Sequence, residues 1–153
     1  MKVCILGNGL TSLTLAKALV NQGIYVDLYL NKKNTNFDKT RTIGISKSNI
    51  EFFNKYVTNI KNFLWDIRKI EIFSENLNNE KILRFQNKTE NLFSIIRFSD
   101  LYNCLLTDLK KSRLVKFKKG TNYKTFVEKD KRIIFNCDSK NLISKKFFYK
   151  KVD

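Results

Sequence analysis

Residues 1–33, MKVCILGNGLTSLTLAKALVNQGIYVDLYLNKK, decide the fold of this chain. Residues 2–6 form a short, continuous apolar run, which is typical of a buried parallel strand. Apolar residues then recur at helical spacing over residues 11–21, and Gly23 is placed to end that helix. Residues 24–30 indicate a second strand. Two near-parallel strands joined by one helix predict a βαβ unit with a right-handed crossover.

The turn between the first strand and the helix, Gly7-Asn8-Gly9-Leu10-Thr11-Ser12, fits the G-x-G-x-x-G pattern at two of its three glycines. Gly7 permits the sharp turn, and Gly9 lets a pyrophosphate approach the backbone N–H groups at the helix N-terminus. Ser12 replaces the third glycine, whose role is close packing of helix on strand. Thr11 or a neighbour is expected to cap the helix. A glycine turn between a strand and a helix favours dinucleotide binding over a purely structural turn.

The end of the second strand departs further from the dinucleotide pattern. Leu30 stands where an acidic side chain usually accepts hydrogen bonds from the adenosine ribose. Asn31 is adjacent and offers an acceptor, while Lys32 and Lys33 leave a 2′-phosphate, and hence NADP, open. An unpaired ribose contact costs on the order of 1–3 kcal/mol, which weakens binding without abolishing it.

The remaining pattern predicts an α/β fold in which a Rossmann-like βαβ unit is followed by antiparallel strands and a C-terminal β-meander. A polar loop is expected over residues 31–39. Helical segments are predicted over residues 48–56, 60–65 and 99–111, the last capped by Ser99 or Asp100 and burying Leu101, Leu105, Leu106 and Leu109. Strands are predicted over residues 67–73, 81–85, 92–98, 114–120, 122–130, 131–137 and 143–149.

Composition limits the class of protein. The chain has 153 residues and 42% hydrophobic content, which suits one globular domain with a buried core. No run approaches the roughly 18 apolar residues of a membrane span, so we expect a cytoplasmic protein. Cys4, Cys104 and Cys137 lie far apart and there is no histidine, which argues against a zinc site and against histidine-based catalysis.

The net charge of +16 would attract nucleic acid or an anionic membrane surface. The lysines after Lys110, however, alternate with apolar residues as the solvated faces of strands do, and no nucleic-acid recognition motif is present. We therefore expect no nucleic-acid partner, and expect these lysines to scatter over outer faces rather than to line one groove.

Two further motifs give the chain a resemblance to a known family. Arg41-Thr42-Ile43-Gly44-Ile45-Ser46 is similar to an R-x-x-A-L-S segment before a helix, and the segment from Arg97 to Leu105 is similar to an R-x-x-L-x-x-x-L return helix. With the glycine turn, these resemble the FAD-dependent aromatic hydroxylases, specifically the ubiquinone-biosynthesis branch related to p-hydroxybenzoate hydroxylase. The likeness covers essentially the whole chain at low identity.

The resemblance implies a flavin-dependent monooxygenase that uses FAD, NAD(P)H as reductant and oxygen to hydroxylate an aromatic ring. Because the cofactor does the chemistry, no catalytic side chain is expected. Peripheral association with the inner face of a membrane, or with an assembly of ubiquinone-biosynthesis enzymes, is compatible with this family. The implied cofactor-binding residues are Gly7, Asn8, Gly9, Leu10, Thr11, Ser12, Asn31, Arg41 and Arg97.

In the same family, the chain continues after the meander into a strand and an aspartate-glycine segment that touches the flavin. A later glycine-aspartate segment binds the ribityl chain, and we expect this sequence to stop before either segment. It is then the N-terminal portion of a longer hydroxylase and binds FAD weakly or not at all. The implied division is residues 1–66 for the first part of the FAD domain, 67–98 for substrate-domain strands, and 99–153 for the return to the FAD domain.

Two alternatives remain open. An NAD(P)-binding Rossmann reductase explains the glycine turn and would use Lys32 and Lys33, but predicts continued alternation of strands and helices after residue 40. A basic nucleic-acid-binding protein explains the charge but not the glycine turn.

Overall fold

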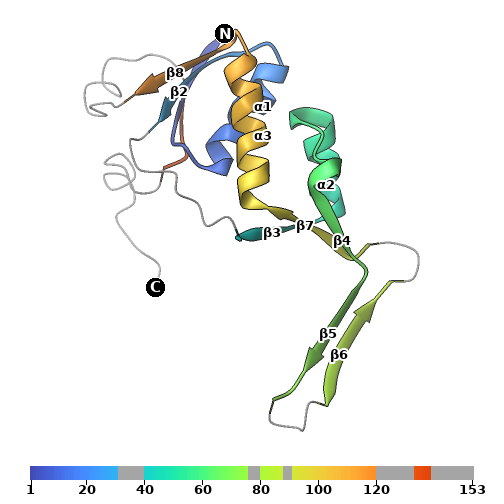
Figure 1. Cartoon of the computed structure of the whole chain (residues 1–153). Coiled ribbons are helices and arrows are strands. Elements are labelled where there is room, and N and C mark those ends of the chain that lie inside the picture. The colour runs from blue at the N-terminus through green and yellow to red at the C-terminus, as the bar shows by residue number, and fades with distance from the viewer. Residues whose placement is uncertain (31–39, 76–79, 88–90, 120–132, 139–153) are drawn as a thin grey trace. The chain divides into compact units, whose positions relative to one another are not determined.

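A computed structural model describes residues 1–30, 40–75, 80–87, 91–119 and 133–138. The chain divides into two compact units, residues 1–36 with 102–153 and residues 37–101, and the division falls within a helix. The first unit holds a parallel sheet and the second holds antiparallel strands (Figure 1). The predicted mixed α/β class is confirmed.

The first unit is built on a four-stranded sheet of order β8-β2-β1-β9, in which every neighbouring pair is parallel. Its strands are β1 (Lys2–Leu6), β2 (Tyr25–Leu30), β8 (Val115–Lys119) and β9 (Ile133–Asn136). From Val3 to Leu6 the side chains of β1 are fully buried. Burial on both faces explains why this strand has an uninterrupted apolar sequence.

Helix α1 (Leu10–Asn21) joins β1 to β2, and helix α3 (Phe98–Lys111) leads into β8. In the first unit, α1 and the part of α3 after residue 101 lie on the same side of the sheet (Figure 1), where Lys17 Nζ is 3.8 Å from Asp108 Oδ2. Gly23, with φ +74°, follows α1 as predicted. The predicted parallel βαβ unit is confirmed.

The strands near the C-terminus correct one prediction. Residues 114–120 and 131–137 do contain strands, but β8 and β9 do not form an antiparallel meander with each other. Instead β8 pairs with β2 and β9 pairs with β1, both in parallel. The two strands of the βαβ unit each have one outer edge, and β8 and β9 add to these edges. The predicted strands 122–130 and 143–149 lie outside the described residues, as do most of the lysines expected to scatter.

The second unit contains an antiparallel sheet of order β3-β7-β4, with β3 (Thr42–Ile45), β4 (Leu64–Ile67) and β7 (Phe93–Arg97). Helix α2 (Lys47–Phe52) follows β3 and continues as a π-helical turn, Phe53–Val57. Ser46 caps α2, since its hydroxyl oxygen accepts a hydrogen bond from the Asn49 N–H at 3.3 Å. The predicted helix over 48–56 is therefore present and begins one residue earlier.

The bounds of several elements predicted over residues 60–111 were wrong. Over residues 60–65 only Lys61–Phe63 is helical, as a short 3-10 turn, because Leu64 and Trp65 already belong to β4. The single strand predicted over 67–73 is two strands in different sheets, separated at Arg68. The helix predicted over residues 99–111 is α3, and it begins one residue earlier, at Phe98. Leu101, Leu105 and Leu109 are buried as expected, and Leu106 is half-buried.

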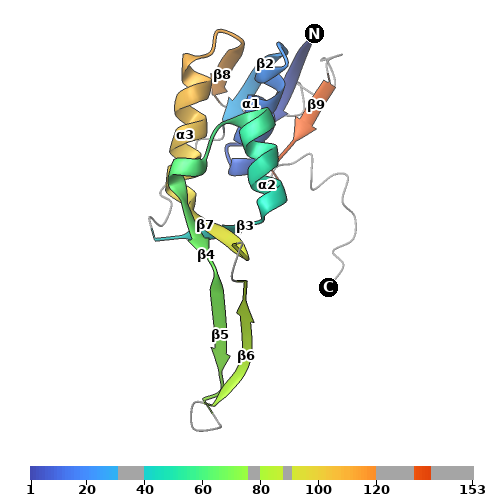
Figure 2. The same cartoon turned by 90° about the vertical axis from the view of Figure 1, so that its right-hand side faces the viewer.

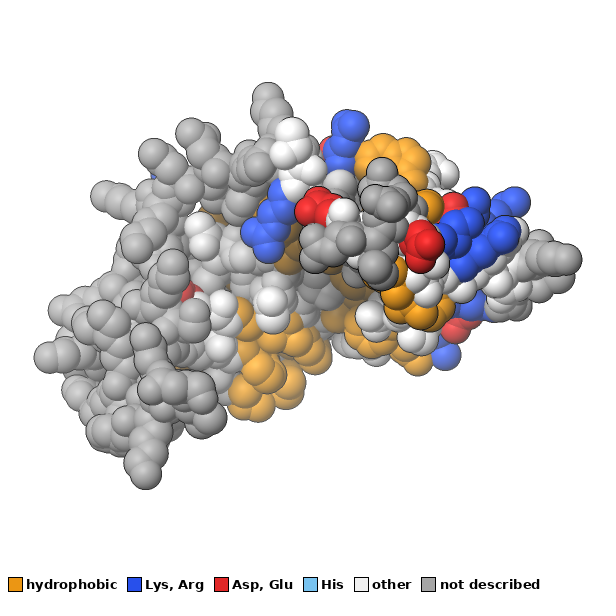
Figure 3. All heavy atoms as spheres, turned by 90° about the horizontal axis from the view of Figure 1, so that it is seen from below, with side chains coloured by type: hydrophobic (Ala, Val, Ile, Leu, Met, Phe, Trp, Pro, Cys, Tyr) orange, Lys and Arg blue, Asp and Glu red, His pale blue; other side chains and the backbone are white. Residues whose placement is uncertain are grey.

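A separate two-stranded ribbon is formed by β5 (Lys69–Phe73) and β6 (Lys81–Gln86), and it extends away from the three-stranded sheet (Figure 2). Ile70 lies opposite Phe85 and Ile72 opposite Leu83, so one face of this ribbon is apolar. Ile72 is 43% exposed, Leu83 48% and Phe85 50%. Figure 3 shows hydrophobic side chains at the surface beside Lys, Arg and acidic side chains.

The charged face of the ribbon centres on Glu71. Its carboxylate lies 2.7 Å from Lys69 Nζ and 2.6 Å from Lys81 Nζ, with Arg84 Nε at 3.8 Å. Hydrogen bonds from Lys69 and Lys81 lower the pKa of Glu71 from 4.5 to about 2. Among the helices of the described residues, none has the length and apolar character needed to cross a membrane.

Candidate dinucleotide site

Gly7 makes the first turn of the site possible. Its φ is +128°, a conformation that side-chain-bearing residues rarely adopt, and its N–H donates to the Tyr29 carbonyl at 3.0 Å. A Cβ at this position would lie 3.2 Å from the carbonyl carbon and oxygen of Cys137. The packing of the protein itself therefore requires glycine at position 7, because β2 and the residue after β9 both lie against it.

Gly9 differs from Gly7, because a Cβ added to it would meet nothing within 4 Å. It is the N-cap of α1, with extended backbone, and no side chain caps this end of the helix. The first helical hydrogen bond runs from the Leu13 N–H to the Gly9 carbonyl at 3.1 Å, so the N–H groups of Leu10, Thr11 and Ser12 have no acceptor within the helix. The prediction that Thr11 or a neighbouring side chain caps α1 is therefore wrong.

The arrangement at Gly9 fits the pyrophosphate of a dinucleotide such as FAD. The open space beside Gly9 allows a phosphate to approach the backbone, and the three N–H groups with the helix dipole favour negative charge there. The first turn of α1, all of which is described, contains no acidic side chain that would repel an anion.

Ser12 occupies the place of the third glycine without forcing the helix away from the sheet. It is fully buried, and its hydroxyl donates to the Gly9 carbonyl at 2.7 Å, which satisfies the hydroxyl within the turn. The substitution of serine for glycine is thus compatible with close packing.

The end of β2 lies next to the turn, since Leu6 of β1 pairs with Tyr29 and Leu30 follows. Leu30 is half-buried and supplies no acceptor for a ribose. Three residues relevant to the ribose lie outside the described residues. They are Asn31, the expected alternative acceptor, and the two lysines that would favour NADP, Lys32 and Lys33.

Sequence reasoning missed the contribution of β9. The Cys137 N–H donates to the Leu6 carbonyl at 2.8 Å, which sets the Cys137 backbone against Gly7, with Asp138 next in sequence. Burial raises the pKa of the Cys137 thiol, so this side chain adds no negative charge beside the turn. The run Ile133, Ile134, Phe135 was the available signal, because continuous apolar residues indicate a parallel strand more than a meander.

β9 is followed by Cys137 and Asp138, where this described segment ends.

The two arginines implied for the flavin lie in the second unit, Arg41 directly before β3 and Arg97 at the end of β7. The Phe98 N–H donates to the Arg41 carbonyl at 2.9 Å. The Arg41 guanidinium stacks 4.8 Å above the Phe98 ring, and that of Arg97 lies 5.0 Å above the Trp65 ring. Both arginines are exposed and their backbones are neighbours, but each guanidinium lies over a different ring.

Comparison with protein-family models and with curated protein sequences finds no match. Solved structures do match. They include p-nitrophenol 4-monooxygenase PnpA from Pseudomonas putida DLL-E4, with 14% identity and a TM-score of 0.62 over 76% of this chain and 31% of that one. PqsL, a probable FAD-dependent monooxygenase from Pseudomonas aeruginosa, has 14% identity and a TM-score of 0.62, over 78% and 32% of the two chains.

Klebsiella pneumoniae HpxO, solved with FAD and uric acid, has 20% identity and a TM-score of 0.57, over 76% of this chain and 30% of that one. At these identities the comparisons establish a shared fold. The chain spans about a third of the length of the structures it matches.

Proposed function

We propose that this chain provides the FAD-binding part of a flavin-dependent monooxygenase that hydroxylates an aromatic ring, with a ubiquinone-biosynthesis intermediate as its substrate. The observation that carries the proposal is the open approach to Gly9 at an uncapped helix N-terminus. The matched structures, which include a nitrophenol monooxygenase and a protein solved with FAD, support this choice over a lone NAD(P)-binding reductase. The antiparallel second unit also supports this choice, because an NAD(P)-binding reductase would continue the alternation of strands and helices there.

In this proposal the N–H groups of Leu10, Thr11 and Ser12 hold the pyrophosphate, and Gly7, Asn8 and Gly9 shape the turn. Asn31 takes the ribose contact that Leu30 cannot make. Arg41 and Arg97 interact with the phosphates and the flavin. FAD, reduced by NAD(P)H, supplies the electrons that activate oxygen, and this chain supplies binding and orientation.

The substrate in this proposal is a small aromatic molecule, and the protein is cytoplasmic. The net charge of +16 supports peripheral association with an anionic membrane surface at the inner face, or with other enzymes of the pathway.

The test is titration of the purified 153-residue chain with FAD, followed by flavin fluorescence, in wild type and in the variants Gly9→Ala and Gly44→Ala. Alanine at Gly9 meets no protein atom but occupies the space through which the pyrophosphate approaches. Alanine at Gly44 makes only an ordinary 3.7 Å contact with Phe93 and serves as the control.

The sequence led us to expect weak FAD binding or none, and the open turn at Gly9 favours the first of these. We therefore expect weak but saturable FAD binding that Gly9→Ala reduces by at least about tenfold and Gly44→Ala leaves unchanged. Absence of saturable FAD binding by the wild type, or preference for NADPH over FAD, would contradict the proposal. Equal FAD affinity in Gly9→Ala and wild type would place the binding elsewhere.

A further inference from the structure

The amino ends of three neighbouring strands in the first unit carry exposed apolar side chains. Met1, directly before β1, is 74% exposed, Tyr25 at the start of β2 is 52% exposed, and Ile133 at the start of β9 is 54% exposed. Because β2, β1 and β9 run parallel, these residues lie at one edge of the sheet. Among the described residues of this unit, they are the large apolar side chains with the greatest exposure, and their gathering at one edge indicates a binding surface.

Cationic side chains border the same edge. Helix α3 ends with Lys110 and Lys111, and Arg113 lies in the turn that leads into β8. The Val26 N–H donates to the Leu114 carbonyl at 2.8 Å, which sets this turn beside the start of β2. All three cationic side chains are exposed, and Figure 1 shows the end of α3 and the N-terminus at the same end of the first unit. We call these three cations, with Met1, Tyr25 and Ile133, the amino edge.

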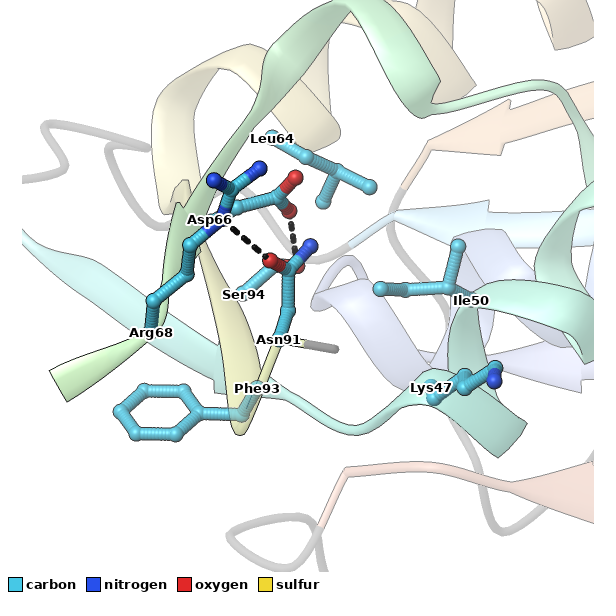
Figure 4. Close-up of a pocket in the computed structure, with 8 residues that line it drawn as sticks. All are labelled: Lys47, Ile50, Leu64, Asp66, Arg68, Asn91, Phe93 and Ser94. Carbon is cyan, nitrogen blue, oxygen red and sulfur yellow. Dashed lines mark hydrogen bonds between the residues drawn. The ribbon is translucent and has the colours of Figure 1, made fainter. Parts of the chain in front are cut away.

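The cations of the amino edge differ from several others in the described chain, which have partners. The lysines of the ribbon surround Glu71, and Arg68 Nε donates to Asn91 Oδ1 at 3.2 Å (Figure 4). Asp108, which precedes the amino-edge lysines in α3, lies 3.8 Å from Lys17. Within the part of the chain that the structure describes, no acidic side chain forms an ion pair with a cation of the amino edge. Their charge is therefore available to an anion outside the protein.

The amino edge lies at the opposite end of the strands from the dinucleotide turn. Met1 precedes β1 and Gly7 follows it, so the strand separates them by roughly 20 Å at 3.3 Å per residue. A large partner bound at the amino edge therefore leaves the approach to Gly9 open.

An anionic lipid bilayer matches both chemical features of this surface. Lys and Arg side chains are attracted to anionic headgroups, and Tyr and aliphatic side chains gain free energy at the boundary between headgroups and acyl chains. A nucleic-acid backbone matches the cations but leaves the apolar side chains in water. A second copy of the chain, bound through the same edge, would bring like charges together.

We propose that the amino edge binds an anionic lipid membrane surface. Lys110, Lys111 and Arg113 pair with headgroup phosphates, while Tyr25 and Ile133 enter the interfacial layer. The assignment names the surface by which the proposed monooxygenase contacts a membrane, and to that extent it rests on the proposed function. It adds an orientation, in which the dinucleotide turn faces away from the lipid.

The test is co-sedimentation of the full 153-residue chain, without FAD, with two kinds of vesicle. One is phosphatidylcholine alone, and the other is phosphatidylcholine with phosphatidylglycerol at a ratio of about three to one. The variants are the double substitution Lys110→Gln with Lys111→Gln, which removes two cations, and Tyr25→Ser, which removes an exposed ring.

The matched controls lie in the second unit. Lys55→Gln with Lys61→Gln removes two exposed lysines and leaves the same net charge as the first variant. Phe52→Ser removes an aromatic ring of similar exposure, 46%. A loss of binding that depends only on net charge or on total exposed aromatic surface would appear equally in variants and controls.

We expect the chain to bind the anionic vesicles, and to bind phosphatidylcholine alone at least about tenfold more weakly. Raising the salt from about 0.05 M to about 0.5 M should release the chain. The double lysine variant should bind the anionic vesicles at least about tenfold more weakly, and Tyr25→Ser several-fold more weakly, while both controls bind as wild type does.

Equal binding to the two kinds of vesicle, or an equal loss in variants and controls, would overturn the proposal. So would a preference for duplex DNA over anionic vesicles at the same phosphate concentration, because the partner would then be a nucleic acid. The comparison between vesicles and DNA needs only wild type, so a variant that fails to fold does not prevent the test.

FAD titration of the same samples separates the two proposals. If the chain binds anionic vesicles as expected but does not bind FAD, the membrane assignment holds and the monooxygenase assignment fails. If FAD binds and the vesicles do not, only the membrane assignment is lost. Where both bind, FAD affinity should be the same with and without vesicles, and competition between them would contradict the placement of the lipid at the amino edge.

Discussion

Ser12 donates its hydroxyl to the carbonyl oxygen of Gly9 at 2.7 Å, and the same carbonyl accepts the first helical hydrogen bond of α1. We predict that Ser12→Ala lowers the free energy of unfolding by about 1 kcal/mol, because one buried hydrogen bond is lost. Ser12→Val should cost more, roughly 1–3 kcal/mol, because the hydrogen bond is lost and a side chain with one more heavy atom than serine must fit in a fully buried position of the turn.

Urea denaturation measures both effects, and Thr11→Ala, at an exposed position of the same turn, is the control. A Ser12→Val variant as stable as wild type would show that the turn has room for a larger side chain.

The two glycines of the turn should separate stability from binding. Gly7→Ala must adopt φ near +128° and place its Cβ 3.2 Å from the Cys137 backbone, so we expect a loss of at least roughly 1–3 kcal/mol in unfolding free energy. Hydrogen exchange should also speed up at the Cys137 amide, which is bonded to Leu6. Gly9→Ala should leave both quantities close to wild type. Equal stability of Gly7→Ala and wild type would contradict the close approach of β9.

The β5–β6 ribbon should loosen in acid. The pKa of Glu71 falls from 4.5 to about 2 in the folded chain, because Lys69 and Lys81 donate hydrogen bonds to its carboxylate. A lowered folded-state pKa means that this contribution to stability is complete above about pH 4.5 and is lost as the pH falls toward 2. We therefore expect protection factors of the β5 amides to decrease over this interval.

In Glu71→Gln the protection of β5 should be low at pH 5 already and change little on acidification. Glu75→Gln, an exposed acid that follows the same strand, should behave as wild type does. Protection in wild type that is constant from pH 5 to pH 2 would rule out a role for the Glu71 carboxylate in holding the ribbon.

Trp65 is the one tryptophan of the chain and therefore an unambiguous fluorescent probe. Because the Arg97 guanidinium lies 5.0 Å over its ring, Arg97→Leu should change the Trp65 emission and lower stability by about 0.5–1 kcal/mol. Arg113→Leu should change neither quantity. An unchanged Trp65 spectrum in Arg97→Leu would mean that the two side chains do not stack in solution.

The βαβ unit could be predicted because its signals are local. The apolar run before Gly7, the helical periodicity and Gly23 each act within a few residues, and the structure confirms all three. The pairing of β8 and β9 could not be predicted in this way. Strand alternation in residues 114–120 is compatible with either direction of pairing. The apolar run at residues 133–135 favours a parallel strand, but the choice of partner depends on edges of β2 and β1 that lie far away in sequence.

The candidate dinucleotide site, too, could be predicted only in part from local sequence signals. The glycine pattern identified Gly7 and Gly9 but could not show that one serves the packing of the protein and the other leaves space for a ligand. The break at Arg68 that separates β4 from β5 was also missed, because no proline or glycine marks it.

The strand order of the first sheet has a consequence for synthesis of the chain. Val3 pairs with Ile133, 130 positions later, so the first strand to leave the ribosome waits for one of its two neighbours until residue 133 has emerged. At roughly 5–20 residues per second this delay is on the order of ten seconds. During that time one edge of β1 and the backbone around Gly7 lack the cover that Cys137 gives later. The nascent chain should therefore depend on chaperones that shield an open strand edge, and the dinucleotide turn should form only after β9 has emerged.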